Sequence, residues 1–321
     1  MERILIIGAN GQIGSELVTA LAGQHGAANV IAADIGADNL YGAERYVRLD
    51  VLDKDAVSRL VNDEGITQVY QLAALLSATG EKAPLKAWSL NMDGLLNILE
   101  IARERLDAGK PFKVFWPSSI AAFGPNTPPD APQYAVMDPT SIYGISKLAG
   151  ERLCEYYHAK YGVDVRSIRY PGIISFKSPP GGGTTDYAIA IFHSALKGET
   201  YECFLGPETT LPMIYMPDAI RATIELMDAP AGQVKIRSSY NVAGVSFNPR
   251  ELAAAIQQKL PAFRIAYQPD SRQQIADSWP KSLDDARAQQ DWGWKARIGV
   301  EEMVVDMLAN VQVSVDDGVT A

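Results

Sequence analysis

The chain has 321 residues, of which 47% are hydrophobic and 21% charged, a composition that is typical of a folded globular protein and excludes long disordered stretches. With 29 basic and 38 acidic residues the formal charge is -9, which disfavours binding to nucleic acid or to an anionic membrane. The length exceeds that of one usual hydrophobic core, so we expect a large domain and a smaller lobe.

The start of the chain, its apolar stretches and its cysteines indicate the cellular compartment. A strand-like run begins at Ile4, which leaves no room before it for a signal or transit segment, and no apolar stretch reaches the ~18 residues of a membrane span. The two cysteines, Cys154 and Cys203, lie far apart in sequence and form no CxxC motif, so the pattern predicts neither a disulfide framework nor a zinc site. These features predict a reduced, cytoplasmic protein.

Short apolar runs alternate with helical patterns in the first half of the chain. The runs expected to be strands are residues 4–7, 30–33, 69–72, 113–116 and 164–169. Unbroken apolar runs are typical of strands that are buried on both faces, and crossover helices between them imply parallel pairing. The sequence therefore predicts an α/β fold with a doubly wound parallel sheet of the Rossmann type.

The residue pattern changes in the second half of the chain. Pro- and Gly-rich loops follow residue 171, and helices are predicted over residues 185–197 and 218–227, with a strand over 239–242. The chain thus returns to the sheet before it completes the smaller lobe. We expect residues 1–172 and 216–246 to form the dinucleotide-binding domain, residues 173–215 and 247–312 a smaller α/β substrate-binding lobe, and residues 313–321 a tail.

A glycine-rich turn follows the first predicted strand and precedes a helix predicted over residues 15–22. Glycines at such a turn permit a tight bend and let backbone N–H groups approach a pyrophosphate at the positive end of the helix. The predicted cofactor contacts in this turn are Gly8, Asn10, Gly11, Gln12, Ile13 and Gly14.

Asp34 ends the second predicted strand, about 20 residues beyond the glycine turn, where a carboxylate accepts both hydroxyls of the adenosine ribose and repels a 2'-phosphate. Since no Arg or Lys follows directly, the sequence favours NAD over NADP. Further ends of strands at the same edge of the sheet are also predicted to contact the cofactor, namely Asp50, Val51, Leu72, Ala73 and Ala74.

Tyr143 and Lys147 are four residues apart and hence lie on one face of a helix. The nearby ammonium, together with the positive charge of oxidised nicotinamide, is expected to lower the pKa of Tyr143 below its reference value of about 10. Such a tyrosine can take a proton from an alcohol. Ser118 and Ser119, at the end of a preceding strand, are candidates for a hydrogen bond to the substrate hydroxyl.

In this order, and together with Asn91 and Arg169-Tyr170-Pro171-Gly172, these motifs resemble the extended short-chain dehydrogenase/reductases over essentially the whole chain. The resemblance implies that Ser119 is the catalytic serine, that Tyr143 is the base, and that Lys147 also holds the nicotinamide ribose. It adds Asn91, Tyr170 and Pro171 to the predicted cofactor contacts.

Two branches of that superfamily fit the catalytic set: nucleotide-sugar epimerases and dehydratases, and the short-chain type of L-threonine 3-dehydrogenase. Epimerases usually carry Asn after the Arg-Tyr pair, where this chain has Pro171, and dehydratases usually carry Thr-Asp-Glu where it has Ser118-Ser119-Ile120. The segments that resemble the threonine branch are residues 116–125, 180–188, 211–216 and 277–280. This resemblance implies oxidation of the C3 hydroxyl of L-threonine by NAD to 2-amino-3-oxobutanoate.

For that small substrate the predicted contacts are Ser77, Ser118, Ser119, Tyr143, Thr184, Thr185 and Trp279. A nucleotide-sugar epimerase or dehydratase is the alternative enzyme, and a catalytically inactive NAD-sensing regulatory protein is the alternative from another class. A metal-dependent reaction is disfavoured, because His25, His158 and His193 are scattered along the chain and form no metal-ligand motif. The predicted helices over 90–106 and 141–161 resemble the dimer-forming pair of the superfamily, so we expect a homodimer.

Overall fold

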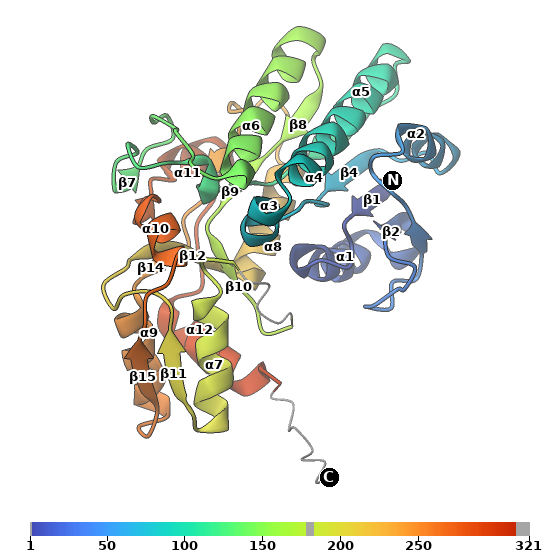
Figure 1. Ribbon diagram of the computed structural model, residues 1–321. Helices are drawn as coiled ribbons and strands as arrows, with labels where there is room; N and C mark the ends of the chain where they lie inside the picture. The colour runs from blue at the N-terminus through green and yellow to red at the C-terminus, as the bar shows by residue number, and fades with distance from the viewer. Residues whose placement is uncertain (1, 178–182, 313–321) are drawn as a thin grey trace.

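The computed structural model describes residues 2–177 and 183–312 (Figure 1). The predicted tail over residues 313–321 lies outside the described residues, as does most of the Pro- and Gly-rich loop that follows Lys177. The chain forms two lobes, with the large parallel sheet and its helices in the upper part of Figure 1 and a smaller group of strands and helices below it.

A six-stranded parallel sheet organises the larger lobe, with the strand order β3-β2-β1-β4-β5-β8. Its strands are β1 (Ile4–Ile7), β2 (Val30–Asp34), β3 (Tyr46–Arg48), β4 (Gln68–Gln71), β5 (Lys113–Phe115) and β8 (Asp164–Arg166). Strands after β1 run first to one side of it and then, from β4, to the other. The predicted doubly wound sheet is confirmed.

Helices cover both faces of this sheet, as Figure 1 shows. They are α1 (Gln12–His25), α2 (Lys54–Asp63), α5 (Gly94–Asp107), α6 (Ile142–Tyr161) and α8 (Met216–Asp228). Successive side chains of a strand point to opposite faces, so Ile4 and Ile6 pack in the core with α1 and α8, whereas Leu5 and Ile7 pack in the core with α2, α5 and α6. Two buried faces explain why the strand sequences are apolar at nearly every position.

The predicted strand over residues 164–169 is two strands. Its first half is β8, which pairs with β5, and its second half is β9 (Ile168–Tyr170), which pairs with β6 (Ser118–Ser119) and β13 (Tyr240–Asn241). The apolar pattern does not reveal that the strand changes its pairing partner at Ser167, because both halves of the run over 164–169 are buried. It brings Arg169 and Tyr170 directly beside the two serines.

Further short elements complete the fold. They are the 3-10 turns η1 (Ala27–Asn29) and η3 (Ile120–Ala122), the helices α3 (Ser77–Lys82), α4 (Pro84–Trp88) and α11 (Ala286–Trp292), the π-helical segment η2 (Ser89–Asp93), and the paired strands β7 (Asp130–Ala131) and β16 (Ser282–Leu283). The predicted helix over 90–106 therefore contains a wider π turn before α5 begins.

The smaller lobe has a separate apolar core. Its strands are β10 (Gly172–Ile174), β11 (Thr200–Cys203), β12 (Leu211–Tyr215), β14 (Val245–Phe247) and β15 (Arg264–Tyr267), and its helices are α7 (Tyr187–Lys197), α9 (Pro249–Lys259), α10 (Arg272–Asp277) and α12 (Val300–Asn310). Ala288 and Trp294 pack in a core of the larger lobe instead, so the last third of the chain contributes to both.

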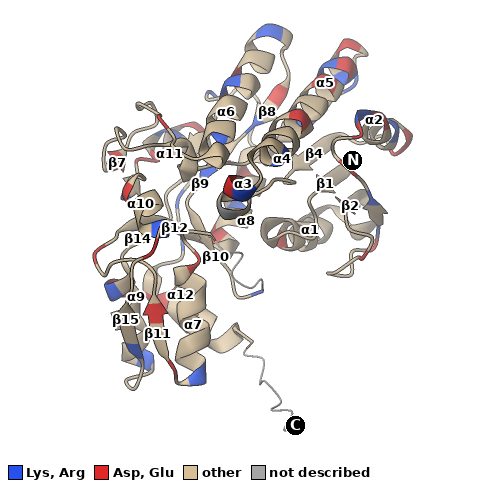
Figure 2. Ribbon diagram, in the orientation of Figure 1, with Lys and Arg blue, Asp and Glu red and all other residues tan. Residues whose placement is uncertain are grey.

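Charge is dispersed over the surface. Figure 2 shows acidic and basic residues interspersed on both lobes. Within the two described ranges, no helix is both long enough and apolar enough to cross a bilayer. Cys154 and Cys203 are both free and buried.

Candidate active site

A cavity of about 470 Å³ lies where the two lobes meet. Five parts of the chain supply most of its wall: the turn after β1, the segment after β4, the β6–α6 region, the β9–β10 segment, and the start of α7 with the loop after α10. The lining residues that the sequence predicted are Gly8, Asn10, Gly11, Gln12, Ile13, Gly14, Leu72, Ala74, Ser77, Ser118, Ser119, Tyr143, Lys147, Tyr170, Pro171, Thr184, Thr185 and Trp279. One cavity thus collects nearly all of the predicted site.

The glycine turn lies at the point where the strand order of the sheet reverses. Gly8 follows β1 with a φ of 88°, in the region that favours glycine, and a Cβ there would lie 2.7 Å from the Ala73 backbone nitrogen. A Cβ on Gly14 would lie 2.2 Å from the Gly8 carbonyl oxygen. Both glycines are therefore required for the close packing of α1 on the turn.

The turn fits the pyrophosphate of a dinucleotide. No side chain caps the N-terminus of α1, and its first turn contains no acidic residue, so its N–H groups and the positive end of the helix face the cavity without competition from a carboxylate. Beside it, the Asn10 backbone N–H donates to Asp34 Oδ2 at 3.0 Å. Asp34 therefore stands next to the turn at the end of β2, where the sequence predicted a ribose contact.

Five predicted cofactor residues do not line the cavity: Asp34, Asp50, Val51, Ala73 and Asn91. The first four lie at or near ends of strands on the same edge of the sheet. Asn91 is different, because its buried side chain donates to Leu75 O and Ser146 Oγ and accepts from Leu75 N. Its amide anchors the segment that follows β4, and the direct cofactor contact of Asn91 stays a prediction.

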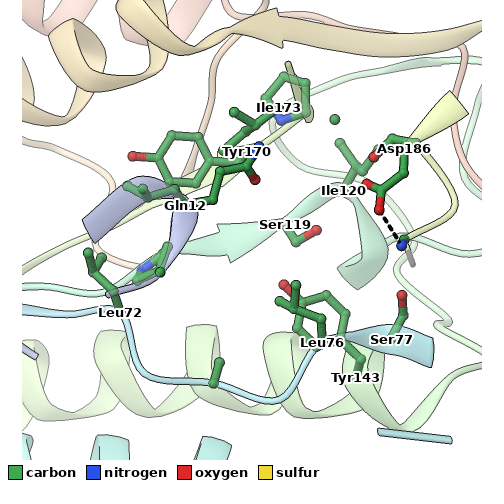
Figure 3. A pocket seen from close by; sticks show the side chains of 18 of the residues that line it. Gln12, Leu72, Leu76, Ser77, Ser119, Ile120, Tyr143, Tyr170, Ile173 and Asp186 are labelled. Atoms are coloured by element: carbon green, nitrogen blue, oxygen red, sulfur yellow. Dashed lines mark hydrogen bonds between the residues drawn. The ribbon is translucent and has the colours of Figure 1, made fainter. Parts of the chain in front are cut away.

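The three predicted catalytic residues line the cavity. Figure 3 shows Ser119, at the end of β6, facing Tyr143 on α6. The Ser119 hydroxyl lies close enough to the Tyr143 phenol to favour the phenolate. Lys147, one turn along α6, has its Nζ 5.4 Å from the centroid of the Tyr143 ring. Tyrosine, serine and lysine are therefore assembled on one wall, as their spacing predicted.

The pKa of Tyr143 differs from the sequence-based expectation. Burial raises the pKa of the phenol to about 12, and the nearby Ser119 hydroxyl opposes the rise only in part. The expected lowering by Lys147 is absent, because burial also lowers the pKa of that ammonium, to about 7. The prediction that Lys147 acidifies Tyr143 is therefore wrong for the chain by itself.

Lys147 is held by the backbone that precedes the serines. Its Nζ donates to the Pro117 carbonyl oxygen at 2.5 Å and lies 4.5 Å from the centroid of the Trp116 ring. These contacts keep the nearly buried amine on the β5–β6 connection.

Ser118 already has a hydrogen-bond partner within the protein. Its hydroxyl donates to Glu151 Oε1 at 2.6 Å, and the side chain is only 1% exposed. Ser118 lines the cavity, but its hydroxyl proton already has a buried acceptor, and its contact with substrate stays a prediction. Of the two serines, Ser119 is the one that meets Tyr143.

The side of the cavity that faces the smaller lobe carries the predicted substrate contacts Ser77, Thr184, Thr185 and Trp279. Sequence reasoning missed several other residues that line the cavity, which are Tyr41, Leu76, Pro117, Ile120, Ile173, Gly183, Asp186 and Ile189. Leu76, Pro117, Ile120, Gly183 and Asp186 adjoin a predicted residue in sequence, which was the available signal. Asp186 accepts a hydrogen bond from the Gly183 backbone N–H at 2.7 Å, as Figure 3 shows.

In the described part of the chain, no group of three or more His, Cys, Asp or Glu residues is placed to hold a metal ion. A doubly wound sheet, a glycine turn at its switch point and a Ser-Tyr-Lys trio define a dinucleotide-binding protein of the extended short-chain dehydrogenase/reductase class. A model of the NAD-dependent epimerase/dehydratase family matches residues 4–243.

Three relatives agree with this class. A GalE-like L-threonine dehydrogenase from Cupriavidus necator, solved in its holo form, is 59% identical, with 97% of this chain and 100% of that chain covered and a TM-score of 0.93. The mitochondrial L-threonine 3-dehydrogenase of Bos taurus is 42% identical over 96% of this chain and 82% of that protein. A monomeric L-threonine 3-dehydrogenase from a metagenome, in its apo form, is 44% identical, with 96% and 98% covered and a TM-score of 0.91. The chain belongs to the NAD-dependent epimerase/dehydratase family.

Proposed function

We propose that this protein is an L-threonine 3-dehydrogenase, which oxidises the C3 hydroxyl of L-threonine with NAD and yields 2-amino-3-oxobutanoate and NADH. The observation that carries the proposal is the single cavity that joins the Ser-Tyr-Lys trio, the glycine turn and the threonine pair at 184 and 185. The names of the three relatives support the same substrate.

In the proposed reaction, Tyr143 takes the proton of the C3 hydroxyl while C3 gives up a hydride, so that the alcohol becomes a ketone. Ser119 hydrogen-bonds the same oxygen and keeps it against the phenol. Lys147 holds the Pro117 carbonyl and, when charged, favours the phenolate. NAD, when bound, supplies the nicotinamide C4 that accepts the hydride.

The residues proposed to hold NAD follow the edge of the sheet. The glycine turn and the start of α1 bind the pyrophosphate, and Asp34 binds the adenosine ribose and disfavours NADP. Asp50, Val51 and Ala73 are proposed to contact the adenine side, and Tyr170 and Pro171 the nicotinamide side. Lys147 is also proposed to bind the nicotinamide ribose.

The proposed threonine site lies between Ser119 and the smaller lobe. Hydroxyl groups of Ser77, Thr184 and Thr185 suit the polar carboxylate and ammonium of a small amino acid. Ile120 and Trp279 supply apolar surface for its methyl group. In this proposal residues 1–172 and 216–246 bind the cofactor, and residues 173–215 and 247–312 bind the substrate.

The proposal is tested by following NADH absorbance after mixing the purified protein with NAD and L-threonine at mildly alkaline pH, with L-serine and UDP-galactose in parallel. We expect NADH formation that is fastest with threonine. Tyr143→Phe should abolish turnover and leave NAD binding largely intact, whereas Tyr134→Phe, which changes an exposed tyrosine outside the cavity, should retain it.

Two other outcomes would overturn the assignment. Turnover of UDP-galactose without turnover of threonine would make the protein a nucleotide-sugar enzyme. NAD binding without turnover of any of these substrates would favour the regulatory alternative.

We also propose a cytoplasmic homodimer. The two buried free cysteines are compatible with a reducing compartment. The proposed interface is the outer surface of α5 and α6, which lie side by side in Figure 1 and expose the apolar side chains Leu106, Ile145 and Tyr156.

A further inference from the structure

A buried ion pair lies directly behind the two serines and joins α6 to β9. Glu151 is 0% exposed, and its Oε1 accepts from Arg169 Nε at 2.9 Å while its Oε2 accepts from Arg169 Nη2 at 2.8 Å. Arg169 Nη1 donates to Gln133 O at 2.9 Å and to Asn241 Oδ1 at 3.0 Å. The pair is bidentate and most of its remaining polar groups are hydrogen-bonded, which is the arrangement that buried charges require.

The Glu151 carboxylate is linked to the proposed catalytic residues through Ser118. Glu151 Oε1 accepts the Ser118 hydroxyl at 2.6 Å, and Ser118 immediately precedes Ser119 on β6. Arg169 pairs with Ser118 in the β6–β9 ladder. The ion pair therefore holds the two-residue strand β6 in two ways, through the Ser118 side chain and through the adjacent strand β9. A two-residue strand has few backbone hydrogen bonds of its own, which makes side-chain anchoring important for its position.

Helix α6 adds a second link to the same segment. Tyr143, Lys147 and Glu151 follow one another at intervals of four residues, so they lie on one face of the helix at successive turns. Lys147 holds the Pro117 carbonyl, and Glu151 holds the Ser118 hydroxyl. One face of α6 thus carries the proposed base and two side chains that bind the segment leading to Ser119.

We propose that Glu151 and Arg169 form a positioning unit, which acts through Ser118 to hold Ser119 against Tyr143 and through its carboxylate to favour the charged form of Lys147. The proposal rests on the function proposed above, because it assigns no chemistry to the pair beyond placing the trio.

The surroundings of Lys147 are consistent with an electrostatic contribution from Glu151. On its own helix it faces Tyr143, Glu151 and Cys154, and from the β5–β6 connection it meets the Trp116 ring and the Pro117 carbonyl. Burial lowers the pKa of Lys147, whereas Cys154 and then the negative charge of Glu151 oppose this fall. Loss of the carboxylate charge is therefore expected to lower the pKa of Lys147 further.

The experiment compares Ser118→Ala, Glu151→Gln, their double variant, and the control Glu155→Gln, which makes the same change one turn further on α6, at a partly exposed residue paired with Arg152. We expect kcat with threonine to fall between about tenfold and about 100-fold for Ser118→Ala and Glu151→Gln, with KM changed much less, because small displacements of reacting groups have effects of this size. If both act on Ser119 by one route, the double variant should be no worse than Glu151→Gln. Glu155→Gln should match the wild type.

A second measurement needs neither substrate nor cofactor. Titration of Lys147 by NMR of ¹³C-labelled lysine, assigned with Lys147→Met, should give a lower pKa in Glu151→Gln and an unchanged pKa in Ser118→Ala and Glu155→Gln. Wild-type kcat in Ser118→Ala, or multiplied effects in the double variant, would overturn the positioning role. Ser118→Ala retains the ion pair, so it decides this point even if Glu151→Gln does not fold.

The two proposals fail in distinguishable ways. A wild-type protein that does not oxidise threonine refutes the proposed function, while the lysine titration still tests the coupling of Glu151 to Lys147. An active wild-type protein with a normal Ser118→Ala variant refutes the positioning unit alone.

Discussion

Tyr143 and Lys147 show how burial can dominate the behaviour of a residue pair. Their spacing predicted one helical face, and the structure places the Lys147 Nζ 5.4 Å from the Tyr143 ring centroid. Both groups lose solvation, however, and desolvation disfavours the charged form of each, so the pKa of tyrosine rises and that of lysine falls. The spacing of residues in a sequence contains no measure of that loss.

The lowered pKa of Lys147 predicts a pH dependence of stability. Below about pH 7, Lys147 is protonated in both the folded and the unfolded chain. Between that pH and about 10.5, Lys147 is protonated mainly in the unfolded chain. Because the unfolded chain then binds more protons, the free energy of unfolding rises with pH. Lys147→Met lacks this contribution. From pH 7 to pH 9 the wild type should therefore gain about 2 kcal/mol relative to the variant.

Urea unfolding of both proteins at the two pH values measures this difference. Tyr143 is retained in both, so its titration largely cancels in the comparison. An equal change of unfolding free energy in wild type and variant would show that Lys147 is not perturbed.

At the scale of elements, the first βα unit is the part of the fold most closely specified by local sequence. Gly8 adopts a positive φ, and Gly14 meets the Gly8 carbonyl, so the turn has no room for side chains at either place. The boundaries of α1 nevertheless differ from the prediction, since the helix extends from Gln12 to His25.

Two glycines of α1 offer a matched test of this argument. Gly14→Ala should weaken NAD binding by at least about tenfold, since a Cβ 2.2 Å from the Gly8 oxygen forces the backbone to move and a cost of ~1.4 kcal/mol gives that factor. Gly23→Ala adds a Cβ with nothing within 4 Å, so it should stabilise the protein by about 0.5–1 kcal/mol and leave NAD binding unchanged.

Titration with NADH, followed by its fluorescence, compares the affinities, and thermal unfolding compares the stabilities. Unimpaired NADH binding by Gly14→Ala would mean that the close packing of α1 on the turn is not needed for the cofactor.

At the scale of the whole molecule, the site exists because two cores meet around one cavity. The glycine turn belongs to the larger lobe and Thr184 and Thr185 to the segment before α7, and they line the same space. The outer surface of α5 and α6 is distinct from this cavity, and it is where we place the dimer interface.

Light scattering should give a mass of twice the 34.8 kDa of the chain. Ile145 and Tyr156 lie on one face of α6 and are 43% and 46% exposed, so Ile145→Glu should shift the protein towards monomer by placing a charge in the proposed interface. Val305→Glu changes a similarly exposed residue of α12, 50% exposed, and should leave the mass unchanged. A wild-type protein that is monomeric at micromolar concentration would refute the dimer. The metagenomic relative is itself described as monomeric.

Local sequence alone determined the strand runs, the glycine turn, and the shared helical face of Tyr143 and Lys147, because periodicity, backbone freedom and helical spacing act over short stretches of chain. Only the tertiary structure decided that residues 164–169 divide between two sheets, that Ser118 turns to Glu151, and that Asn91 anchors the segment after β4. Each of these outcomes depends on partners that are 16 or more residues away in sequence. Burial, which sets the pKa values of the trio, is likewise a property of the assembled fold.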